Sequence, residues 1–238
     1  LPPRVQAHMG LASSSGPELM TAGVLRAATE GDFPPFSVRC RHGVAGIEAA
    51  VMGEVCRRLD LKYEPHILGW SSILEQLQQP ASCTFDLSSA SMDVTEERRL
   101  LWSFTKPYYA AKSVLVSHAK APVDVGSLHG RRVATIEQST FANELLAAGA
   151  VLVCTPAVGD IWVHMLQRGE VEAFATEEAN AESLKQSSAV DLHICAEPIA
   201  IQEKAFAVPF QRPQLLAAVD GALADMQAEG DLQQRVEE

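Results

Sequence analysis

The chain has 238 residues, of which 47% are hydrophobic and 21% charged, and its formal net charge is -11. This length allows one large domain or two lobes of about 100 residues each, with a substantial core. The acidic balance argues against nucleic-acid binding, which requires clustered lysines and arginines. No stretch approaches the roughly 20 uninterrupted apolar residues of a membrane span. The first 20 residues lack a basic start followed by an apolar block, so we expect residues 1–21 to be a flexible leader.

Apolar runs typical of strands alternate with runs that carry apolar residues at helical spacing. Strands are expected at residues 24–29, 61–67, 85–89, 113–117, 132–136, 151–154, 173–176 and 205–208. Helices are expected at residues 46–59, 71–77, 139–148, 159–168 and 179–185, and one or two more within 213–234. This alternation predicts mostly parallel α/β sheets, and because the series occurs twice it predicts two lobes.

Five cysteines show neither a CxxC pair nor Cys/His metal spacing: Cys40, Cys56, Cys83, Cys154 and Cys195. Two interpretations are open, a disulfide between Cys56 and Cys83 or buried free thiols that act as small hydrophobes. The sequence also lacks GxGxxG, P-loop, GxSxG and HExxH motifs, so nucleotide-binding, hydrolase and zinc-protease functions have no support. We expect no cofactor and no metal.

Polar residues follow several of the predicted strands. In open α/β sheets ligands bind beyond the carboxyl ends of the strands, so we expect Glu30, residues 89–93 and Glu177 to lie together. The run SMDVTEERRLLWSFTKPYY at residues 91–109 adds Arg98 five positions after an aspartate. An arginine presents a planar fork of donors that matches a carboxylate, which a lysine cannot reproduce.

This run resembles the signature of bacterial extracellular solute-binding proteins for amino acids, the soluble component of ABC importers. The family's pattern is approximately D-L-I-x-A-G-M-[TSD]-I-T-x-E-R, an apolar stretch and then P-Y-Y. The matching residues are Asp86, Leu87, Ala90, Ser91, Met92, Asp93, Val94, Thr95, Glu97, Arg98, Phe104, Pro107, Tyr108 and Tyr109. Segments at residues 28–36, 46–62, 69–70, 128–140 and 169–178 resemble further family elements in the same order.

The resemblance implies a two-lobed periplasmic-binding-protein (Venus-flytrap) fold, in which each lobe is a mostly parallel sheet flanked by helices and two hinge crossovers join the lobes. We expect residues 22–111 with 208–238 to form lobe 1 and residues 112–207 to form lobe 2. The implied function is not enzymatic. The expected protein is a periplasmic or extracellular monomer that encloses a small amino acid and delivers it to the membrane subunits of an ABC transporter.

The resemblance also assigns roles in binding the amino acid. Arg98 is expected to bind the carboxylate, together with Ser139 and Thr140 at the start of a predicted helix, where backbone N–H groups are free. Glu177 is expected to accept from the α-ammonium. Ala90 and Ser91 are expected to contribute further contacts, and Phe33 and Trp70 to sandwich the ligand side chain.

Two acidic residues, Asp93 and Glu30, indicate which kind of side chain the amino-acid ligand carries. Asp93 stands where many relatives have Ser or Thr; an ionised aspartate only accepts hydrogen bonds, so it either orients Arg98 or pairs with a positive ligand group. Residues 91–98 and 28–36 resemble periplasmic arginine-binding proteins, in which the position of Glu30 meets a distal cation. We therefore expect arginine or another basic amino acid. Ser91 and Gln138 replace common glycines of the family and narrow the expected site.

Two alternatives share this scaffold. Cyclohexadienyl dehydratase, which acts on prephenate or arogenate, is similar to these binding proteins, and QEKAF at residues 202–206 resembles its E-K-A-Y, making Lys204 a candidate substrate contact. Asn180 stands at the position of that enzyme's catalytic glutamate and cannot donate a proton as an acid would; Glu178 is the candidate substitute. The other alternative is the flytrap sensor domain of a membrane receptor.

Overall fold

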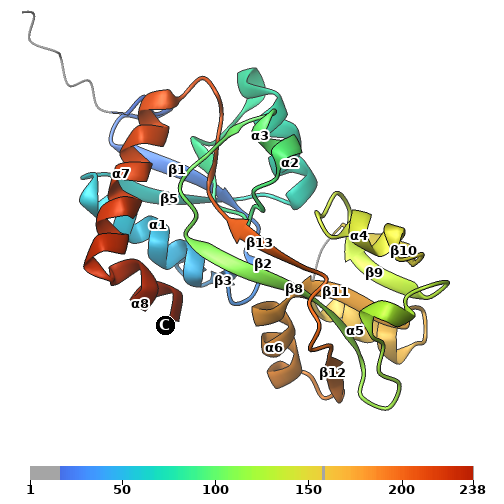
Figure 1. The fold of residues 1–238 in the computed structure, drawn as a ribbon. Coiled ribbons are helices and arrows are strands. Elements are labelled where there is room, and N and C mark those ends of the chain that lie inside the picture. Colours follow the sequence, from blue (N-terminus) through green and yellow to red (C-terminus); the bar gives the residue numbers. More distant parts are fainter. Residues whose placement is uncertain (1–16, 157–158, 238) are drawn as a thin grey trace, which may run out of the picture.

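The computed structural model describes residues 17–156 and 159–237, arranged as two lobes around separate sheets (Figure 1). Most of the predicted leader, residues 1–16, lies outside the described residues. Among the helices of the described part, none combines the length and apolar character needed to cross a membrane. The chain passes between the lobes twice, and the predicted lobe boundaries fall within the strands β8 (Tyr109–His118) and β14 (Ala207–Val208).

Lobe 1 contains a five-stranded sheet in the order β5-β1-β6-β14-β7. Its other strands are β1 (Val24–Thr29), β5 (Lys62–Ile67), β6 (Leu87–Ser88) and β7 (Ser103–Phe104). Strand β1 pairs in parallel with β5 and β6, whereas β14 is antiparallel to β6 and β7. The helices of this lobe are α1 (Ile47–Arg58), α2 (Trp70–Gln78), α3 (Glu96–Arg99), α7 (Pro213–Glu229) and α8 (Asp231–Glu237), with a 3₁₀ turn at Pro80–Ser82. A small antiparallel sheet joins β2 (Asp32–Phe33), β3 (Ser37–Cys40) and β4 (Gly43–Ala45).

Lobe 2 contains a sheet in the order β10-β9-β11-β8-β12, with β13 also paired to β8. Its remaining strands are β9 (Arg132–Ile136), β10 (Val151–Thr155), β11 (Ala173–Glu177), β12 (Leu192–Ile194) and β13 (Ala200–Lys204). Its helices are α4 (Ala142–Ala147), α5 (Asp160–Gln167) and α6 (Glu178–Ser187), with a 3₁₀ turn at Val125–Ser127. Strand β9 is parallel to β10 and β11, whereas β8 is antiparallel to its three partners.

The two long crossover segments run side by side. Strands β8 and β13 pair in antiparallel register from Ser113 opposite Ala200 to Tyr109 opposite Lys204. Strand β8 leads from lobe 1 into lobe 2, and β13 leads back toward lobe 1 (Figure 1). Lys204 therefore lies at the end of a crossover, where β13 leaves the sheet of lobe 2. A backbone bridge from Lys204 to Asp93 connects this point to lobe 1.

Every strand and helix that the sequence predicts is present, which confirms the α/β fold with two lobes. The sheets were expected to be mostly parallel, but both combine parallel and antiparallel pairs, because β14 and β8 run against their neighbours. The predicted helix at residues 139–148 is wrong at its start, because α4 begins at Ala142 and Ser139 and Thr140 lie before it. The short strands β2, β3, β4, β7 and β12, the crossover strand β13 and the single-turn helix α3 were not expected, since runs of two to five residues carry too little periodicity. The proposed Cys56–Cys83 disulfide is also wrong: all five cysteines are free thiols, and Cys56 and Cys83 are buried.

Two non-glycine residues near the junction of the lobes adopt left-handed backbone conformations. Ser91 has φ +46° and Gln138 has φ +61°. A side chain is strained in this region of φ, whereas glycine adopts it without cost. The Ser91 side chain is held by Glu48, whose carboxylate accepts from its Oγ at 3.2 Å and from its backbone N–H.

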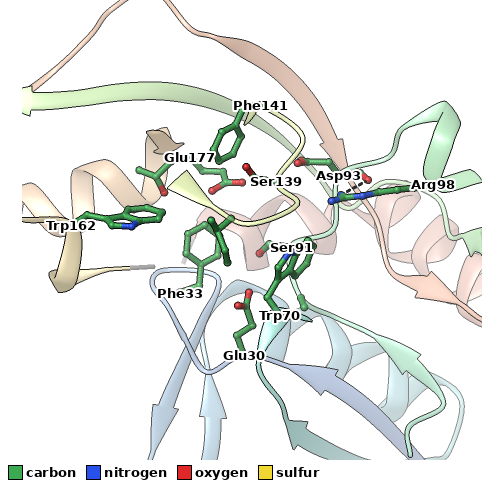
Figure 2. A pocket seen from close by; sticks show the side chains of 13 residues that line it. Glu30, Phe33, Trp70, Ser91, Asp93, Arg98, Ser139, Phe141, Trp162 and Glu177 are labelled. Carbon is green, nitrogen blue, oxygen red and sulfur yellow. Dashed lines mark hydrogen bonds between the residues drawn. The ribbon is translucent and has the colours of Figure 1, made fainter. Parts of the chain in front are cut away.

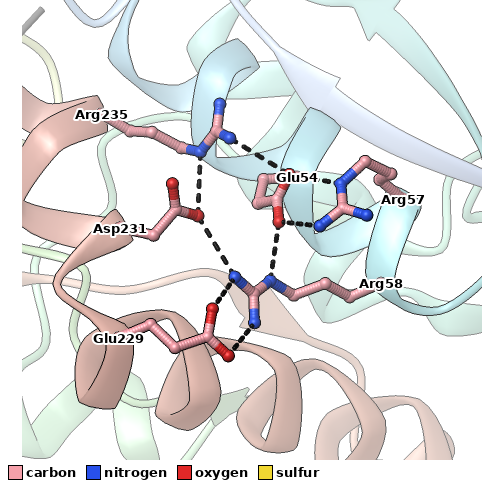
Figure 3. A network of polar contacts seen from close by, with 6 residues as sticks. All are labelled: Glu54, Arg57, Arg58, Glu229, Asp231 and Arg235. Carbon is pink, nitrogen blue, oxygen red and sulfur yellow. Dashed lines mark hydrogen bonds and ion pairs between the residues drawn. The ribbon is translucent and has the colours of Figure 1, made fainter.

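A network of ion pairs joins α1 to the C-terminal helices (Figure 3). Glu54 accepts from Arg57 at 2.6 Å and 2.8 Å, from Arg58 Nε at 2.7 Å and from Arg235 Nη2 at 3.1 Å. Arg58 also pairs with two acids of the last helices, Glu229 and Asp231. These bonds hold α8 against α1, and the hydrogen bond from Arg57, followed by that from Arg58, lowers the pKa of Glu54 to about 2.

Replacing Glu54 should make the stability of the protein less dependent on pH. Because the pKa of Glu54 is lower in the folded state than its ordinary value of 4.5, its stabilising effect is complete above that value and is lost as the pH falls toward 2. We expect Glu54→Gln to lower the free energy of unfolding by about 2 kcal/mol at pH 7 and by less at pH 3. Urea denaturation at both pH values measures this difference. The control is Glu75→Gln, on the exposed side of α2; an equal deficit for Glu54→Gln at both pH values would contradict the prediction.

The backbone of Ser91 predicts an order of stability between two variants. Both Ser91→Gly and Ser91→Ala lose the hydroxyl bond to Glu48, but only alanine keeps a Cβ at φ +46°. We therefore expect the glycine variant to be more stable by about 1 kcal/mol. Ser183 lies within α6, where alanine should instead be more stable than glycine by a similar amount. Chemical denaturation of the four variants decides this; the same order at both positions would refute it.

Candidate functional site

A cavity lies between the lobes, where the carboxyl ends of strands from both sheets meet (Figure 2). Its empty space is about 410 Å³ when the part that is open to solvent is included. It is lined by Glu30, Phe33, Trp70, Ala90, Ser91, Asp93, Arg98, Ile136, Ser139, Phe141, Trp162, Thr176 and Glu177. Both polar and aromatic side chains therefore face the space between the lobes.

The sequence analysis anticipated most of this lining. Nine of its ten ligand-binding candidates line the cavity, and Thr140 is the exception. Lobe 1 supplies residues that follow β1 and β6, the first residue of α2 and Arg98 on α3; lobe 2 supplies residues that follow β9 and the end of β11. The geometric rule for parallel strands brings these segments together, because the carboxyl ends of neighbouring strands meet at one edge of a sheet.

Arg98 is buried and held in place on three sides. Its Nη1 donates to the carbonyl of Asp93 at 3.1 Å, its Nη2 donates to the carbonyl of Gln138 at 3.2 Å, and its guanidinium lies over the Trp70 ring at 5.3 Å. Burial lowers the pKa of Arg98, with the nearby Asp93 carboxylate opposing this change. An arginine keeps its charge in proteins and has five N–H donors, so the two carbonyls leave three for a further acceptor.

Lys204 is buried between two of the acids that line the cavity. Its Nζ lies 2.5 Å from Glu177 Oε1 and 2.6 Å from Asp93 Oδ1, and its side chain is 1% exposed. Burial alone would lower the pKa of Lys204, but the charges of Asp93 and then Glu177 outweigh it and raise the pKa above the ordinary value. The lysine is therefore a permanent ammonium ion at the junction of the lobes.

Asp93 lines the cavity, but its polar atoms are engaged by other residues of the protein. Its backbone carbonyl orients Arg98, while its carboxylate pairs with Lys204 and accepts from Thr140 Oγ1 at 2.5 Å. Thr140 thus contacts lobe 1 from outside the cavity. The sequence left open whether Asp93 orients Arg98 or pairs with a positive ligand group. In the structure the backbone carbonyl of Asp93, not its carboxylate, binds Arg98, and the carboxylate pairs with Lys204 of the same chain.

Glu30 is the acid of the cavity whose carboxylate has no hydrogen bond or ion pair with any described residue. Burial raises the pKa of Glu30 to about 8, with the charges of Asp32, Glu48 and Glu177 acting in the same direction and Lys204 opposing them. The carboxyl group is thus largely protonated at neutral pH. It can donate a hydrogen bond in that state, or ionise when a cation is bound.

The buried acid Glu48 binds the segment of lobe 1 that lines the cavity at Ser91. Glu48 Oε1 accepts from Tyr108 Oη at 2.6 Å and from the Ser91 backbone and hydroxyl, while Glu48 Oε2 has no hydrogen-bond partner among the described residues. Burial raises the pKa of Glu48 to about 7, although the bonds from Tyr108 and Ser91 oppose this. Tyr108 stacks on Phe206 with ring centroids 4.5 Å apart. This network holds the segment that carries Ser91 and Asp93.

Four lining residues were not among the sequence candidates. Ile136 and Thr176 lie at the ends of β9 and β11, so the rule that selected Glu177 could have found them. Trp162 is fully buried and also faces the cavity, and its Nε1 donates to Thr155 Oγ1 at 2.8 Å. Phe141 belongs to the loop before α4, whose course the sequence pattern does not reveal.

Direct hydrogen bonds close the two lobes on each other. Besides the bonds from Arg98 to Gln138 and from Thr140 to Asp93, Trp70 Nε1 donates to the carbonyl of Glu137 at 3.1 Å. Asn180 Nδ2 donates to the carbonyl of Pro34 at 2.6 Å, and its Oδ1 accepts from Thr176. Asn180 therefore fastens the lobes and offers no acid to the cavity.

The remaining candidates for catalysis or metal binding lie elsewhere. Glu178 begins α6 with its side chain 47% exposed and pairs with Lys112 at 3.3 Å. It is absent from the cavity lining, as is Lys204, which lies behind Asp93 and Glu177. Within residues 17–156 and 159–237, no group of three or more His, Cys, Asp or Glu side chains is placed to hold a metal ion.

Comparisons with known proteins agree with this geometry. The probable amino-acid-binding protein YxeM of Bacillus subtilis (strain 168) is 25% identical over 218 residues, which are 88% of this chain and 81% of YxeM. The L-cystine-binding protein TcyJ of Escherichia coli (strain K12) is 25% identical over 223 residues, which are 89% of this chain and 80% of TcyJ. A solved structure of an ancestral arginine-binding protein bound to glutamine superposes with a TM-score of 0.82 at 26% identity, covering 91% of this chain and 97% of that one. The sequence profile of the bacterial extracellular solute-binding proteins, family 3, matches residues 25–238. The chain therefore belongs to the family 3 bacterial extracellular solute-binding proteins.

Proposed function

We propose that the cavity captures a free amino acid and that the closed protein delivers it, as a monomer in the periplasm or outside the cell, to the membrane subunits of an ABC importer. The observation that carries this proposal is Arg98, a buried and oriented guanidinium with free donors, in the same cavity as Glu177 (Figure 2). These two groups complement the carboxylate and the ammonium of a zwitterion. The names of the amino-acid-binding and L-cystine-binding relatives support the ligand class.

The proposed pose follows from the charges. The ligand carboxylate binds the free N–H groups of Arg98 and the hydroxyl of Ser139, and the α-ammonium binds the second carboxylate oxygen of Glu177, since Oε1 is engaged by Lys204. The ligand side chain extends past Phe33, with Trp162 on the far side of the cavity from Arg98 in Figure 2. The Trp70 ring stacks against the guanidinium of Arg98, and it also lines the cavity and contacts the ligand.

Binding proceeds by closure of the lobes. The ligand docks first on Arg98 and Glu30 of lobe 1, and rotation at residues 109–112 and 205–208 brings Ser139 and Glu177 onto it. The two antiparallel crossovers are suited to this motion, because their paired backbones bend together. The bonds of Trp70, Thr140 and Asn180 across the junction then favour the closed form.

Two ligand classes fit the cavity. Arginine or another basic amino acid would place its cation against Glu30, the acid without a partner, and the neighbouring arginine-binding protein supports this choice. A neutral amino acid is favoured by a different observation: the charges of Arg98 and Lys204 already balance those of Asp93 and Glu177. Glu30 would then stay protonated and donate a hydrogen bond.

The dehydratase alternative is not supported. The relatives and structural neighbours named above are binding proteins rather than enzymes. The position of that enzyme's acid is held here by Asn180, whose amide is used between the lobes.

Truncating Arg98 should abolish tight binding without unfolding the protein. Loss of a charge-assisted pair to the ligand carboxylate should cost about 2 kcal/mol or more, roughly 30-fold in Kd. Arg98→Lys keeps the charge but not the planar fork, so its affinity should lie between those of the wild type and Arg98→Ala. Calorimetric titration of ligand-stripped, refolded protein with arginine, lysine, histidine, glutamine and glutamate measures these affinities.

The matched control is Arg99→Ala, because Arg99 lies on the same short helix with its side chain 49% exposed. Its affinity should equal that of the wild type. Wild-type affinity in Arg98→Ala would show that the carboxylate binds elsewhere.

Arginine binding should strengthen as the pH rises toward 8, if arginine is the ligand. The pKa of Glu30 is about 8 without a bound cation, and a guanidinium beside it favours the ionised form, so binding below this pH releases a proton. The affinity should rise by up to about ten-fold per pH unit below the pKa. Titrations at pH 7 in two buffers of different ionisation enthalpy measure the proton release.

The variant Glu30→Gln distinguishes proton release by Glu30 from proton release by Glu48, because the pKa values of the two acids lie close together, at about 8 and about 7. The variant should lose both the proton release and most of the pH dependence for arginine, and it should still bind glutamine. Proton release that persists in Glu30→Gln would assign it to another group, and pH-independent arginine binding in the wild type would place the ligand cation away from Glu30.

A further inference from the structure

A lysine of the protein, Lys204, is buried against two of the acids that line the cavity. Lys204 Nζ is within 2.6 Å of one oxygen of each of two carboxylates, Asp93 and Glu177, and the exposed fractions of the three side chains are 1%, 7% and 7%. Asp93 comes from lobe 1, Glu177 from the end of β11 in lobe 2, and Lys204 from the crossover strand β13. The ammonium thus lies at the point where three parts of the chain converge.

Lys204 acts on a ligand through these two acids. It does not line the cavity, whereas Asp93 and Glu177 do. An α-ammonium at Glu177 is common to all amino acids, whereas a side-chain cation at Glu30 is an additional charge within the field of Lys204, which also acts on Glu30. Because the site is buried, this field is little screened by solvent, and the repulsion between the two cations persists over several ångströms.

The charges around the cavity determine which ligands Lys204 disfavours. With Lys204 present, the two cations Arg98 and Lys204 match the two carboxylates Asp93 and Glu177. A zwitterion with a neutral side chain preserves this balance. A ligand with an additional side-chain cation disturbs it, unless Glu30 loses its proton.

We propose that Lys204 is a specificity-determining residue, a built-in counterion for Asp93 and Glu177 that lowers the preference of the cavity for ligands with a cationic side chain. Lys204 is a positioning residue in this role, because it sets the charge of the acids that face the ligand. The proposal rests on the proposed function, since it concerns which amino acid the same cavity prefers.

The sharpest test compares arginine with citrulline, which has nearly the same shape but carries a neutral ureido group in place of the guanidinium. Calorimetric titration gives the ratio of the Kd for arginine to the Kd for citrulline, at one pH, for each protein. In Lys204→Met this ratio should fall by about ten-fold relative to the wild type, in favour of arginine. In Lys204→Arg, which keeps the charge, it should stay within about two-fold of the wild-type ratio.

A second pair of variants covers the case in which Lys204→Met does not fold, since it leaves two buried carboxylates without their cation. Asp93→Asn and Asp93→Asn/Lys204→Met retain one carboxylate, Glu177, at this point. Removing Lys204 in the Asp93→Asn background should shift the ratio toward arginine by a similar factor. Circular dichroism and thermal unfolding establish that each variant is folded before titration.

The outcomes separate the proposals. A shift of the ratio in the methionine variants but not in Lys204→Arg supports the role of Lys204. Equal weakening of both ligands with an unchanged ratio overturns it and leaves Lys204 as a structural residue of the crossover. Failure of the wild type to bind any amino acid would instead refute the proposed function, on which this role depends.

Discussion

The arrangement of the cavity depends on the burial of two carboxylates against one ammonium. Asp93 and Glu177 belong to different lobes, and Lys204 lies between them on a crossover strand. A buried carboxylate without a partner would take up a proton or force the lobes apart, since desolvation of an unpaired charge is costly. The ion pairs with Lys204 give both acids a cationic partner at the edge of the cavity, and they tie the crossover to both lobes.

Arg98 is positioned by the same segment. The carbonyl of Asp93 and the carbonyl of Gln138 each accept from its guanidinium, and Trp70 covers it. The carbonyl of Asp93 points to Arg98 because residues 91–93 are held from below by Glu48, which binds Ser91 and Tyr108. Because Asp93 and Trp70 belong to lobe 1 like Arg98, they orient the donor fork independently of lobe 2, which reduces the ordering that binding would require.

Glu48 and Glu30 show how burial sets the charge of this region. Both have pKa values raised by desolvation, to about 7 and about 8, and neither carboxyl has a cation as direct partner among the described residues. Asp93 and Glu177 differ from these two acids, because each pairs directly with the buried ammonium of Lys204. The site thus combines two acids committed to a cation of the protein with one, Glu30, that is free to respond to the charge of a ligand.

The sequence by itself determined the two α/β lobes, because hydrophobic periodicity and the alternation of strands and helices are local properties that read directly from residue spacing. It also located the cavity, since the ends of parallel strands meet at one edge and Glu30, Asp93 and Glu177 each follow a strand. Arg98 was identified by the resemblance of residues 91–109 to the signature of the solute-binding proteins, and its fork of donors explains why that position suits a carboxylate. The start of α4 and the short strands were not predictable, because a few residues carry too little periodicity.

Only the tertiary structure decided the partner of each charge. Lys204 is more than 100 residues from Asp93 and 27 residues from Glu177 along the chain, and nothing local indicates that its ammonium reaches both. The same holds for Trp162, which packs in the core and also faces the cavity, and for Asn180, which joins the lobes at Pro34. Electrostatic interactions act between groups that folding brings close, so the charge of a site depends on distances that a linear pattern does not contain.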